Sequence, residues 1–439
     1  MINRKRLLGS LIATAVCAIA LTVGVGSAGA ASATDAFYEY TGSTPLSSYA
    51  PGAVLKTRTV NYHVLGVATP LTTTQMLYRS TGARGQATSN VTTVIQPWCL
   101  FCFNRDKVVS YQSFYDSLNP EDEPSVQIAG GLSLGGAIPQ VETLLIAPYL
   151  IAGYTVVVSD TQGQAADFAA GPEYGTNTLD SIRAAKSSSA VDLSDNAKVA
   201  MIGYSGGAIA TEWASELAPS YAPDLKKNLI GAAYGGVLVD PDHNLGYVGG
   251  STVWAGVAPM ALIGVARSYG IDLQPYLNDY GKTLLTKLNK ASIINVLAQY
   301  SGLKWTDFVK PQYADPHSIP AYVQAANKVI MGTGGTPTIP QFIGQGTGGE
   351  LEGTQANATH GKGDGVMLAG DVRTLARQYC SAGVKVQYNE YALSHFTSVA
   401  LWLPQAIGWL NDRFNGSSAP SNCGSIAPGN SLAPAVPTA

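Results

Sequence analysis

Charged residues are scarce in this chain: 13% of its 439 residues are Asp, Glu, Lys or Arg, and the net charge is −3. The 26 basic residues are fewer than the 29 acidic ones, so the chain has no basic excess that would indicate a nucleic-acid partner. It also has no long run of like charge that would indicate an interaction tail. The hydrophobic fraction of 46% is that of a globular protein, and the length suffices for one large core with an insertion or for two domains.

Long apolar runs are missing after the first 30 residues, since none approaches the roughly 20 residues that a membrane-spanning helix needs. The first 30 residues differ: basic residues at positions 4–6 precede an apolar stretch that ends in Ala-Gly-Ala at 28–30. This pattern predicts a signal peptide over residues 1–30, with an uncleaved membrane anchor as the alternative. The mature protein is therefore expected to be secreted and soluble.

Cysteine is also rare. Of the five cysteines, Cys17 lies in the predicted leader, which leaves an even number in the mature chain. In an oxidising compartment four cysteines favour two disulfides, and we expect Cys99–Cys102 and Cys380–Cys423, the second tying the C-terminal tail to the body. A zinc site or a thioredoxin-like redox motif at the first pair is the weaker alternative.

Apolar segments alternate with helical patterns along most of the chain. Six segments rich in Val, Ile and Tyr are predicted as strands: 107–115, 154–160, 198–204, 229–236, 339–346 and 384–391. Apolar strands that alternate with helices are typical of a mainly parallel sheet covered by helices on both faces. The predicted fold class is therefore α/β.

One block interrupts this alternation. Residues 240–335 contain apolar helical patterns and no strand of the parallel-sheet kind. We expect this block to form a helical cap inserted between the two parts of the core, 31–239 and 336–415; ordinary packing of these helices on the sheet is the alternative. Residues 416–439 are rich in Pro, Ser, Ala and Gly and are predicted to be a flexible tail.

The segment Gly203-Tyr204-Ser205-Gly206-Gly207 fits the pattern G-x-S-x-G between a predicted strand and a predicted helix. In that position a sharp turn exposes the serine hydroxyl at the carboxyl end of the sheet, where sites in open α/β sheets form. Side chains at the outer glycines would collide with the adjacent strand or helix. The pattern predicts a nucleophile at Ser205, with a purely structural turn as the alternative.

A serine hydroxyl needs a base, which in turn needs an orienting acid. In folds with this turn the chain order is serine, acid, histidine. Among the five histidines, His63 and His243 fall outside that order and His317 lies in the predicted cap. His360 precedes the best acid. His395 follows the last strand and precedes the last helix, so we predict that it is the base.

The acid is expected after the preceding strand. Asp364 lies between glycines in front of a helical pattern, and it is the predicted acid. Asp371 falls inside that pattern and is expected to be solvated. Glu350 and Glu352 lie in a glycine-rich insertion and are the remaining candidates.

Several of these segments, among them "VVSYQSFYDSL", "IGYSGGAIATEWASELAPSYAPDL" and "GKGDGVMLAGDVRTLARQYCSAG", resemble the secretory lipase family. This is a lipase-A-like group of α/β-hydrolases with a helical cap that hydrolyse carboxylic esters of lipids. The resemblance implies Ser205 as nucleophile, Asp364 as acid and His395 as base. It also implies an oxyanion hole formed by amides of Asp116, from the Y-D-S segment, and Gly206.

The chain departs from the family pattern in two places. It lacks the cysteine that often follows the Y-D-S segment, and its loop 347–360 before the acid is longer than usual, which bears on access to the site. We expect a secreted serine ester hydrolase that works through an acyl-enzyme on lipid or other acyl esters. Alternatives are an acyltransferase, a peptidase or a non-catalytic binding protein on the same fold. No metal or organic cofactor is implied, and we expect a monomer in transient contact with lipid interfaces.

Overall fold

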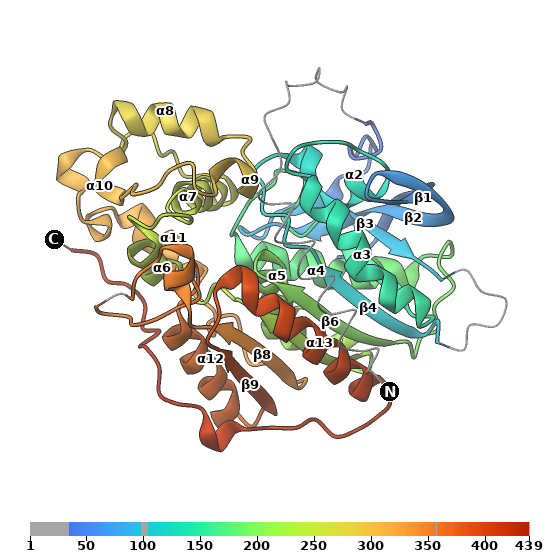
Figure 1. The fold of residues 1–439 in the computed structure, drawn as a ribbon. Helices are drawn as coiled ribbons and strands as arrows, with labels where there is room; N and C mark the ends of the chain where they lie inside the picture. The colour runs from blue at the N-terminus through green and yellow to red at the C-terminus, as the bar shows by residue number, and fades with distance from the viewer. Residues whose placement is uncertain (1–34, 98–103, 357, 439) are drawn as a thin grey trace.

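The structure is a computed structural model that describes residues 35–97, 104–356 and 358–438. The predicted signal peptide and the predicted Cys99–Cys102 pair lie outside the described residues. Figure 1 shows the sheet and its helices in one part of the molecule and a group of helices, α6 to α11, beside them.

A nine-stranded sheet runs through the molecule in the order β1-β2-β3-β5-β4-β6-β7-β8-β9. Its strands are β1 (Val54–Val64), β2 (Val67–Thr81), β3 (Ala87–Ile95), β4 (Lys107–Gln112), β5 (Thr155–Ser159), β6 (Lys198–Tyr204), β7 (Leu229–Gly235), β8 (Gln341–Gly346) and β9 (Val386–Tyr391). The strands from β5 to β9 in this order are parallel, and β1, β2 and β3 are antiparallel. All six predicted strands are present, so the predicted fold class is confirmed.

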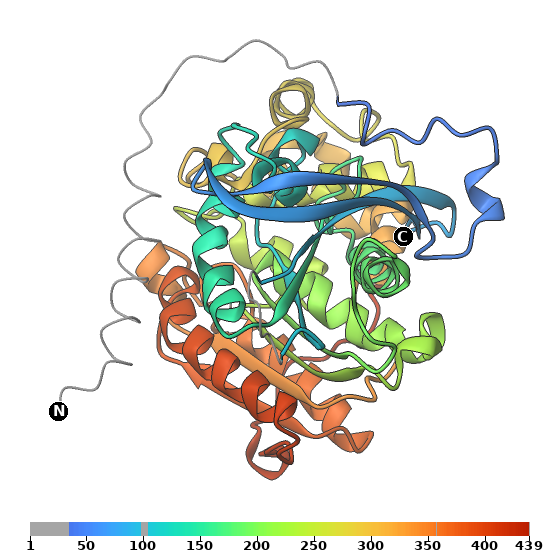
Figure 2. The same cartoon turned by 90° about the vertical axis from the view of Figure 1, so that its right-hand side faces the viewer.

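The first three strands were not predicted. Threonines interrupt the apolar residues of all three strands, and β2 is buried mainly in its second half. The strands β1 and β2 form a long antiparallel hairpin that bends over one end of the sheet, drawn in blue in Figure 2. By contrast, every residue of β5 is buried, as expected for a parallel strand with helices on both faces.

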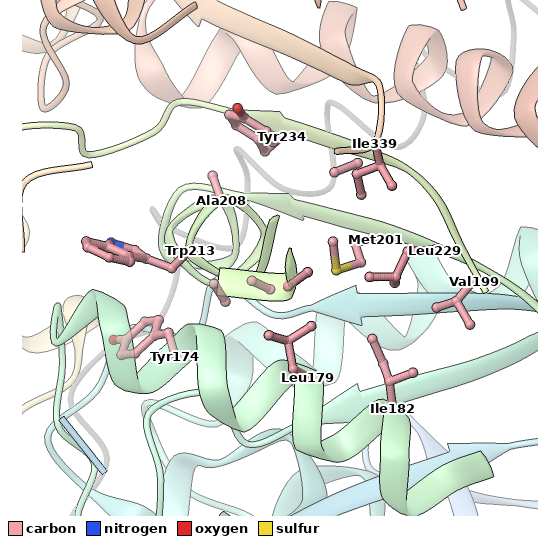
Figure 3. Packing of buried hydrophobic residues seen from close by; sticks show 14 of the residues in the cluster. Tyr174, Leu179, Ile182, Val199, Met201, Ala208, Trp213, Leu229, Tyr234 and Ile339 are labelled. Carbon is pink, nitrogen blue, oxygen red and sulfur yellow. The ribbon is translucent and has the colours of Figure 1, made fainter. Parts of the chain in front are cut away.

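Helices cover both faces of the sheet. One face packs against α4 (Gly171–Ser187), α5 (Gly206–Tyr221) and α12 (Ala369–Ser381), and the other against α2 (Pro124–Ile128), α3 (Ala137–Ile151) and α13 (His395–Phe414). Figure 3 shows the first of these layers, to which Trp213 of α5, Tyr174 of α4 and Met201 of β6 all contribute. Within the described residues, no helix is both long enough and apolar enough to cross a bilayer.

A group of short helices follows β7 and ends before β8. They are α6 (Pro241–Val248), α7 (Val257–Tyr269), α8 (Asp279–Leu288), α9 (Ile293–Val296), α10 (Trp305–Phe308) and α11 (Pro320–Lys328). Helices α6 to α10 share a third hydrophobic cluster, separate from the two clusters on the sheet faces. They lie together to one side of the sheet in Figure 1, and we call residues 240–335 the helical block.

The C-terminal segment after α13 lies against the core. The predicted disulfide between Cys380 and Cys423 is present, and Ile426 is buried in the core cluster of α12. The side chain of Asn430 donates to Asp371, and the amide of Thr438 donates to a carbonyl of the helical block. These contacts give the prediction of a flexible tail no support.

Candidate active site

The predicted serine lies on the sharp turn between β6 and α5. Ser205 has φ 53° and ψ −121°, a conformation that L-residues rarely adopt and that stores strain. A Cβ atom at Gly203 would collide with the carbonyl of Gly207, and one at Gly207 would collide with the carbonyl of Gln112. Both glycines are therefore needed for the close approach of α5 to the strands, as predicted from the spacing.

Ser205, His395 and Asp364 form a continuous hydrogen-bonded chain. The Nε2 atom of His395 lies 2.8 Å from the hydroxyl oxygen of Ser205, and its Nδ1 atom lies 2.7 Å from Oδ2 of Asp364. The other carboxylate oxygen of Asp364 accepts hydrogen bonds from the amides of Val366 (3.0 Å) and Met367 (2.7 Å). The acid is completely buried and its orientation is fixed from both sides.

The buried imidazole of His395 has competing influences on its pKa. Burial alone would lower the pKa, but the charge and hydrogen bond of Asp364, with smaller effects of Glu352 and Asp116, raise it above its usual value. An imidazole in this environment accepts a proton readily, because the imidazolium that forms is stabilised where it stands.

Tyr204 contacts His395 through both its hydroxyl and its ring. Its hydroxyl donates a 2.7 Å hydrogen bond to the backbone carbonyl of His395, and the two ring centroids are 5.2 Å apart. Its ring also lies 5.2 Å from that of Trp402 of α13. The residue before the serine therefore fixes the loop that carries the histidine.

The two residues predicted for an oxyanion hole lie next to each other. Gly206 is the first residue of α5, where a backbone amide has no acceptor within the helix, and a Cβ atom there would collide with Oδ1 of Asp116. Asp116 has φ 37°, and its carbonyl accepts a 2.8 Å hydrogen bond from the amide of Ile293 in the helical block. Burial raises the pKa of Asp116 to about 7, although His395 opposes the shift.

Glu352 was only a minor candidate for the acid, and the structure gives it a different position. Its Oε2 accepts a 2.7 Å hydrogen bond from Nε1 of Trp254, and its Oε1 accepts a 2.9 Å hydrogen bond from the amide of Phe396. The Trp254 ring meets the ring of His395 edge-on at 5.2 Å and stacks on Phe396 at 4.9 Å. The only sequence signal for this contact was the unusual length of loop 347–360.

The expectation that Asp371 is solvated is wrong. Its carboxylate is buried between α12 and α6, 3.2 Å from Nδ1 of His243, and accepts a 2.6 Å hydrogen bond from Asn430. The ring of His360 stacks on His243 at 4.0 Å, so neither histidine belongs to the chain at Ser205. Helical periodicity predicted the helix but not which elements would cover its first turn.

An apolar pocket begins at Ser205, Gly206 and Asp116 and continues into the helical block. The side chains that line it come mainly from the helical block, with a few from the core, and include Phe168, Ile209, Trp254, Leu262, Leu285 and Phe308. The pocket therefore extends from the hydroxyl of Ser205 along an extended apolar lining.

Comparison with known proteins identifies the family of this chain. Residues 129–422 match the family model described as secretory lipase. The chain belongs to the secretory lipase family. Lipase 1 of Candida albicans is 34% identical over 371 residues, covering 80% of this chain and 73% of that protein. A secreted triacylglycerol lipase of Malassezia globosa is 31% identical, covering 86% and 78%.

Two further proteins are similar to this chain. A protein of Mycobacterium tuberculosis named as a probable inactive lipase is 31% identical, covering 83% of this chain and 79% of its own. The crystal structure of Candida antarctica lipase A in its closed state matches with a TM-score of 0.77 at 26% identity, covering 91% of this chain and 90% of that one. Membership alone therefore does not decide activity, which depends on the site.

Proposed function

We propose that this protein is a secreted serine ester hydrolase that cleaves acyl esters of lipids. The observation that carries the proposal is the continuous chain of Ser205, His395 and Asp364 at the inner end of an apolar pocket. A polar chain of this kind activates a hydroxyl, and an apolar pocket accommodates the hydrocarbon of an acyl group. Each residue has a distinct role.

In the first half-reaction, His395 removes the proton from the hydroxyl of Ser205 as its oxygen attacks the ester carbonyl carbon. The backbone amides of Gly206 and Asp116 donate to the oxyanion of the tetrahedral intermediate. The imidazolium, held by Asp364, gives its proton to the leaving alcohol, and the acyl group remains on the serine. Water then repeats the sequence, releasing the carboxylic acid and restoring the serine.

The pocket gives the proposal its substrate class. We propose that residues 240–335 act as a cap whose apolar side chains hold the acyl chain. Each methylene transferred from water to such a wall contributes about 0.8 kcal/mol. Esters of longer acids should therefore bind more tightly until the pocket is filled.

Secretion belongs to the same proposal. The family is described as secretory, and we propose that residues 1–30 direct export of a monomer and are then removed. Mass spectrometry of the protein collected from culture medium tests this point: the mature chain should begin at Ala31. An intact leader on the exported protein would contradict it.

The decisive experiment measures kcat/KM on p-nitrophenyl esters. Ser205→Ala and His395→Ala should each lower kcat by about 10⁵-fold or more, and the double variant should be little worse because the residues act as one unit. Asp364→Asn should lose on the order of 10⁴-fold. The matched controls, Asp371→Asn and His360→Ala, should retain most activity. Near-normal activity of Ser205→Ala would exclude the proposed nucleophile.

A further inference from the structure

Five apolar side chains are exposed close together on the outside of the molecule, and we call them the apolar face. They are Leu65, Val67, Leu132, Leu134 and Leu144, with exposed fractions between 40% and 81%. They come from the turn between β1 and β2 and the first residue of β2, from the loop between α2 and α3, and from α3 itself. Single exposed leucines are ordinary, but a group of them marks an interaction site.

Contacts between these segments bring the hairpin turn, the loop and the helix together. A Cβ atom at Gly66, on the hairpin turn, would lie 3.4 Å from Cδ2 of Leu132. The amide of Leu65 donates to the hydroxyl of Thr143 at 3.4 Å, and Thr143 is the residue before Leu144 in α3. The hairpin turn therefore lies against both the loop and the helix, although more than 60 residues separate them in the chain.

The segments that form this face carry almost no charge. Residues 59–78 contain no Asp, Glu, Lys or Arg, and residues 124–159 contain only Glu142. Glu142 is buried under the sheet side of α3, where it accepts hydrogen bonds from Tyr111 and from the amide of Phe114. These segments therefore contribute apolar side chains and no exposed formal charge, although the exposed Glu121, whose carbonyl accepts from the hydroxyl of Ser133 at 3.3 Å, borders the loop. A surface of this composition suits a neutral partner rather than an ionic one.

The apolar face adjoins the wall of the pocket. A Cβ atom at Gly135, next to Leu134, would touch the side chain of Ser292, directly before α9. An isolated bridge also pairs Ser292 with Ser117, in the segment that leads towards α2. The following residue, Ile293, lines the pocket and donates its amide to the carbonyl of Asp116. One short helix thus separates the apolar face from the candidate oxyanion hole.

We propose that the apolar face docks the enzyme on the surface of aggregated neutral lipid, the phase in which its ester substrate resides. This inference rests on the proposed function, because that function makes a water-insoluble ester the substrate. Insertion of five apolar side chains into a lipid surface is favoured by the hydrophobic effect and needs no anionic headgroup. Binding of this kind is reversible and places the pocket wall at the interface.

A binding experiment tests the proposal without catalysis. The full chain carrying Ser205→Ala is floated with phosphatidylcholine vesicles. Adding Val67→Ser and Leu132→Ser should weaken binding by about tenfold or more, because each change removes an apolar side chain from the contact. Leu401→Ser, at an exposed leucine of α13, is the matched control and should have no effect. Binding should change little between low and high salt.

An activity experiment separates this inference from the proposed function. In the Ser205 enzyme, Val67→Ser with Leu132→Ser should preserve kcat/KM on soluble p-nitrophenyl acetate and lower the rate on emulsified triolein by about tenfold. An enzyme that hydrolyses neither substrate would contradict the proposed function, whereas the flotation result would still decide the docking surface.

Two results would overturn the docking surface. The first is unchanged vesicle binding by the double variant, or an equal loss with Leu401→Ser. The second comes from sedimentation velocity: if the wild-type chain is a dimer and the double variant a monomer with undiminished lipid binding, the apolar face is a contact between two copies of this chain.

Discussion

The indole Nε1 of Trp254 donates a 2.7 Å hydrogen bond to Oε2 of Glu352, and both residues lie beside the imidazole of His395. Trp254 belongs to the helical block and lines the pocket. The same carboxylate also accepts a hydrogen bond from the amide of Phe396, which belongs to α13. One buried carboxylate therefore joins the pocket wall to the helix that carries the candidate base. Two consequences can be measured.

Glu352→Ala should lower kcat by about tenfold, because it leaves two buried donors without an acceptor, at about 1–3 kcal/mol each, and frees the Trp254 ring. Glu352→Gln keeps an acceptor but removes a negative charge that raises the pKa of His395. The acid limb of its kcat/KM profile should therefore move to lower pH while the plateau is largely retained. Glu350→Gln, on the same short 3₁₀ helix (Gly349–Glu352), is the control and should leave the limb unchanged. An unshifted limb in Glu352→Gln would contradict the electrostatic role.

Asp116→Asn should extend activity to higher pH. Burial raises the pKa of Asp116 to about 7, so the wild-type residue becomes a carboxylate beside the oxyanion position above that pH. Asparagine has a similar shape and cannot ionise, so kcat/KM should fall less between neutral and alkaline pH. Identical alkaline limbs in the two proteins would show that Asp116 does not ionise in this range.

The same substitution has a consequence for stability. A carboxyl group whose folded pKa is raised favours folding while it is protonated, and this contribution is lost as the pH rises from its ordinary pKa of 3.8 towards about 7. Thermal unfolding midpoints of Asp116→Asn should therefore decline less than those of the wild type over that interval.

The length of the pocket should determine the preferred acyl chain. Esters from acetate to palmitate should show kcat/KM rising by more than about tenfold with chain length, mainly through KM, until the pocket is filled. Ala325→Trp places a large ring in the pocket lining of α11, and it should reduce activity on long chains while sparing acetate. A steady decline beyond butyrate in the wild type would indicate a short-chain esterase instead.

Removing the Cys380–Cys423 disulfide should reduce stability more than activity. The bond closes a loop with a sequence separation of 43, for which the chain-entropy model gives about 4 kcal/mol. The Cys380→Ser/Cys423→Ser variant should unfold at a lower temperature and denaturant concentration than the wild type. Its kcat/KM on a soluble ester should change little, since the bond joins the end of α12 to the tail. A large loss of activity in the folded variant would contradict this separation.

Local patterns in the sequence predicted much of the site. The glycines around Ser205 are required by the tight turn itself, so their spacing indicates the turn without any knowledge of distant residues. Asp364 and His395 follow from the chain order of this fold, and the structure brings both to the serine. The parallel strands were predicted because burial on both faces makes their sequences continuously apolar.

Contacts between distant segments could not be predicted in this way. The burial of Asp371 depends on α6 and on the tail, which lie far from it in the sequence. The contact of Glu352 with Trp254 joins residues 98 positions apart, and no local period records it. The strands β1 to β3 were missed because their many threonines, and in β1 and β2 their exposed positions, weaken the apolar pattern.

The tail has a further consequence for the helical block. The backbone of Ala435 exchanges two hydrogen bonds with the side chain of Asn327 in α11, at 2.8 and 2.9 Å, and a covalent bond at Cys423 attaches the same segment to the core. The C-terminal segment thus forms a third link between the helical block and the core, besides the two places where the chain enters and leaves the block. Proteolytic cleavage between Cys423 and Ala435 would remove that link, and we expect it to weaken the attachment of α11 to the core.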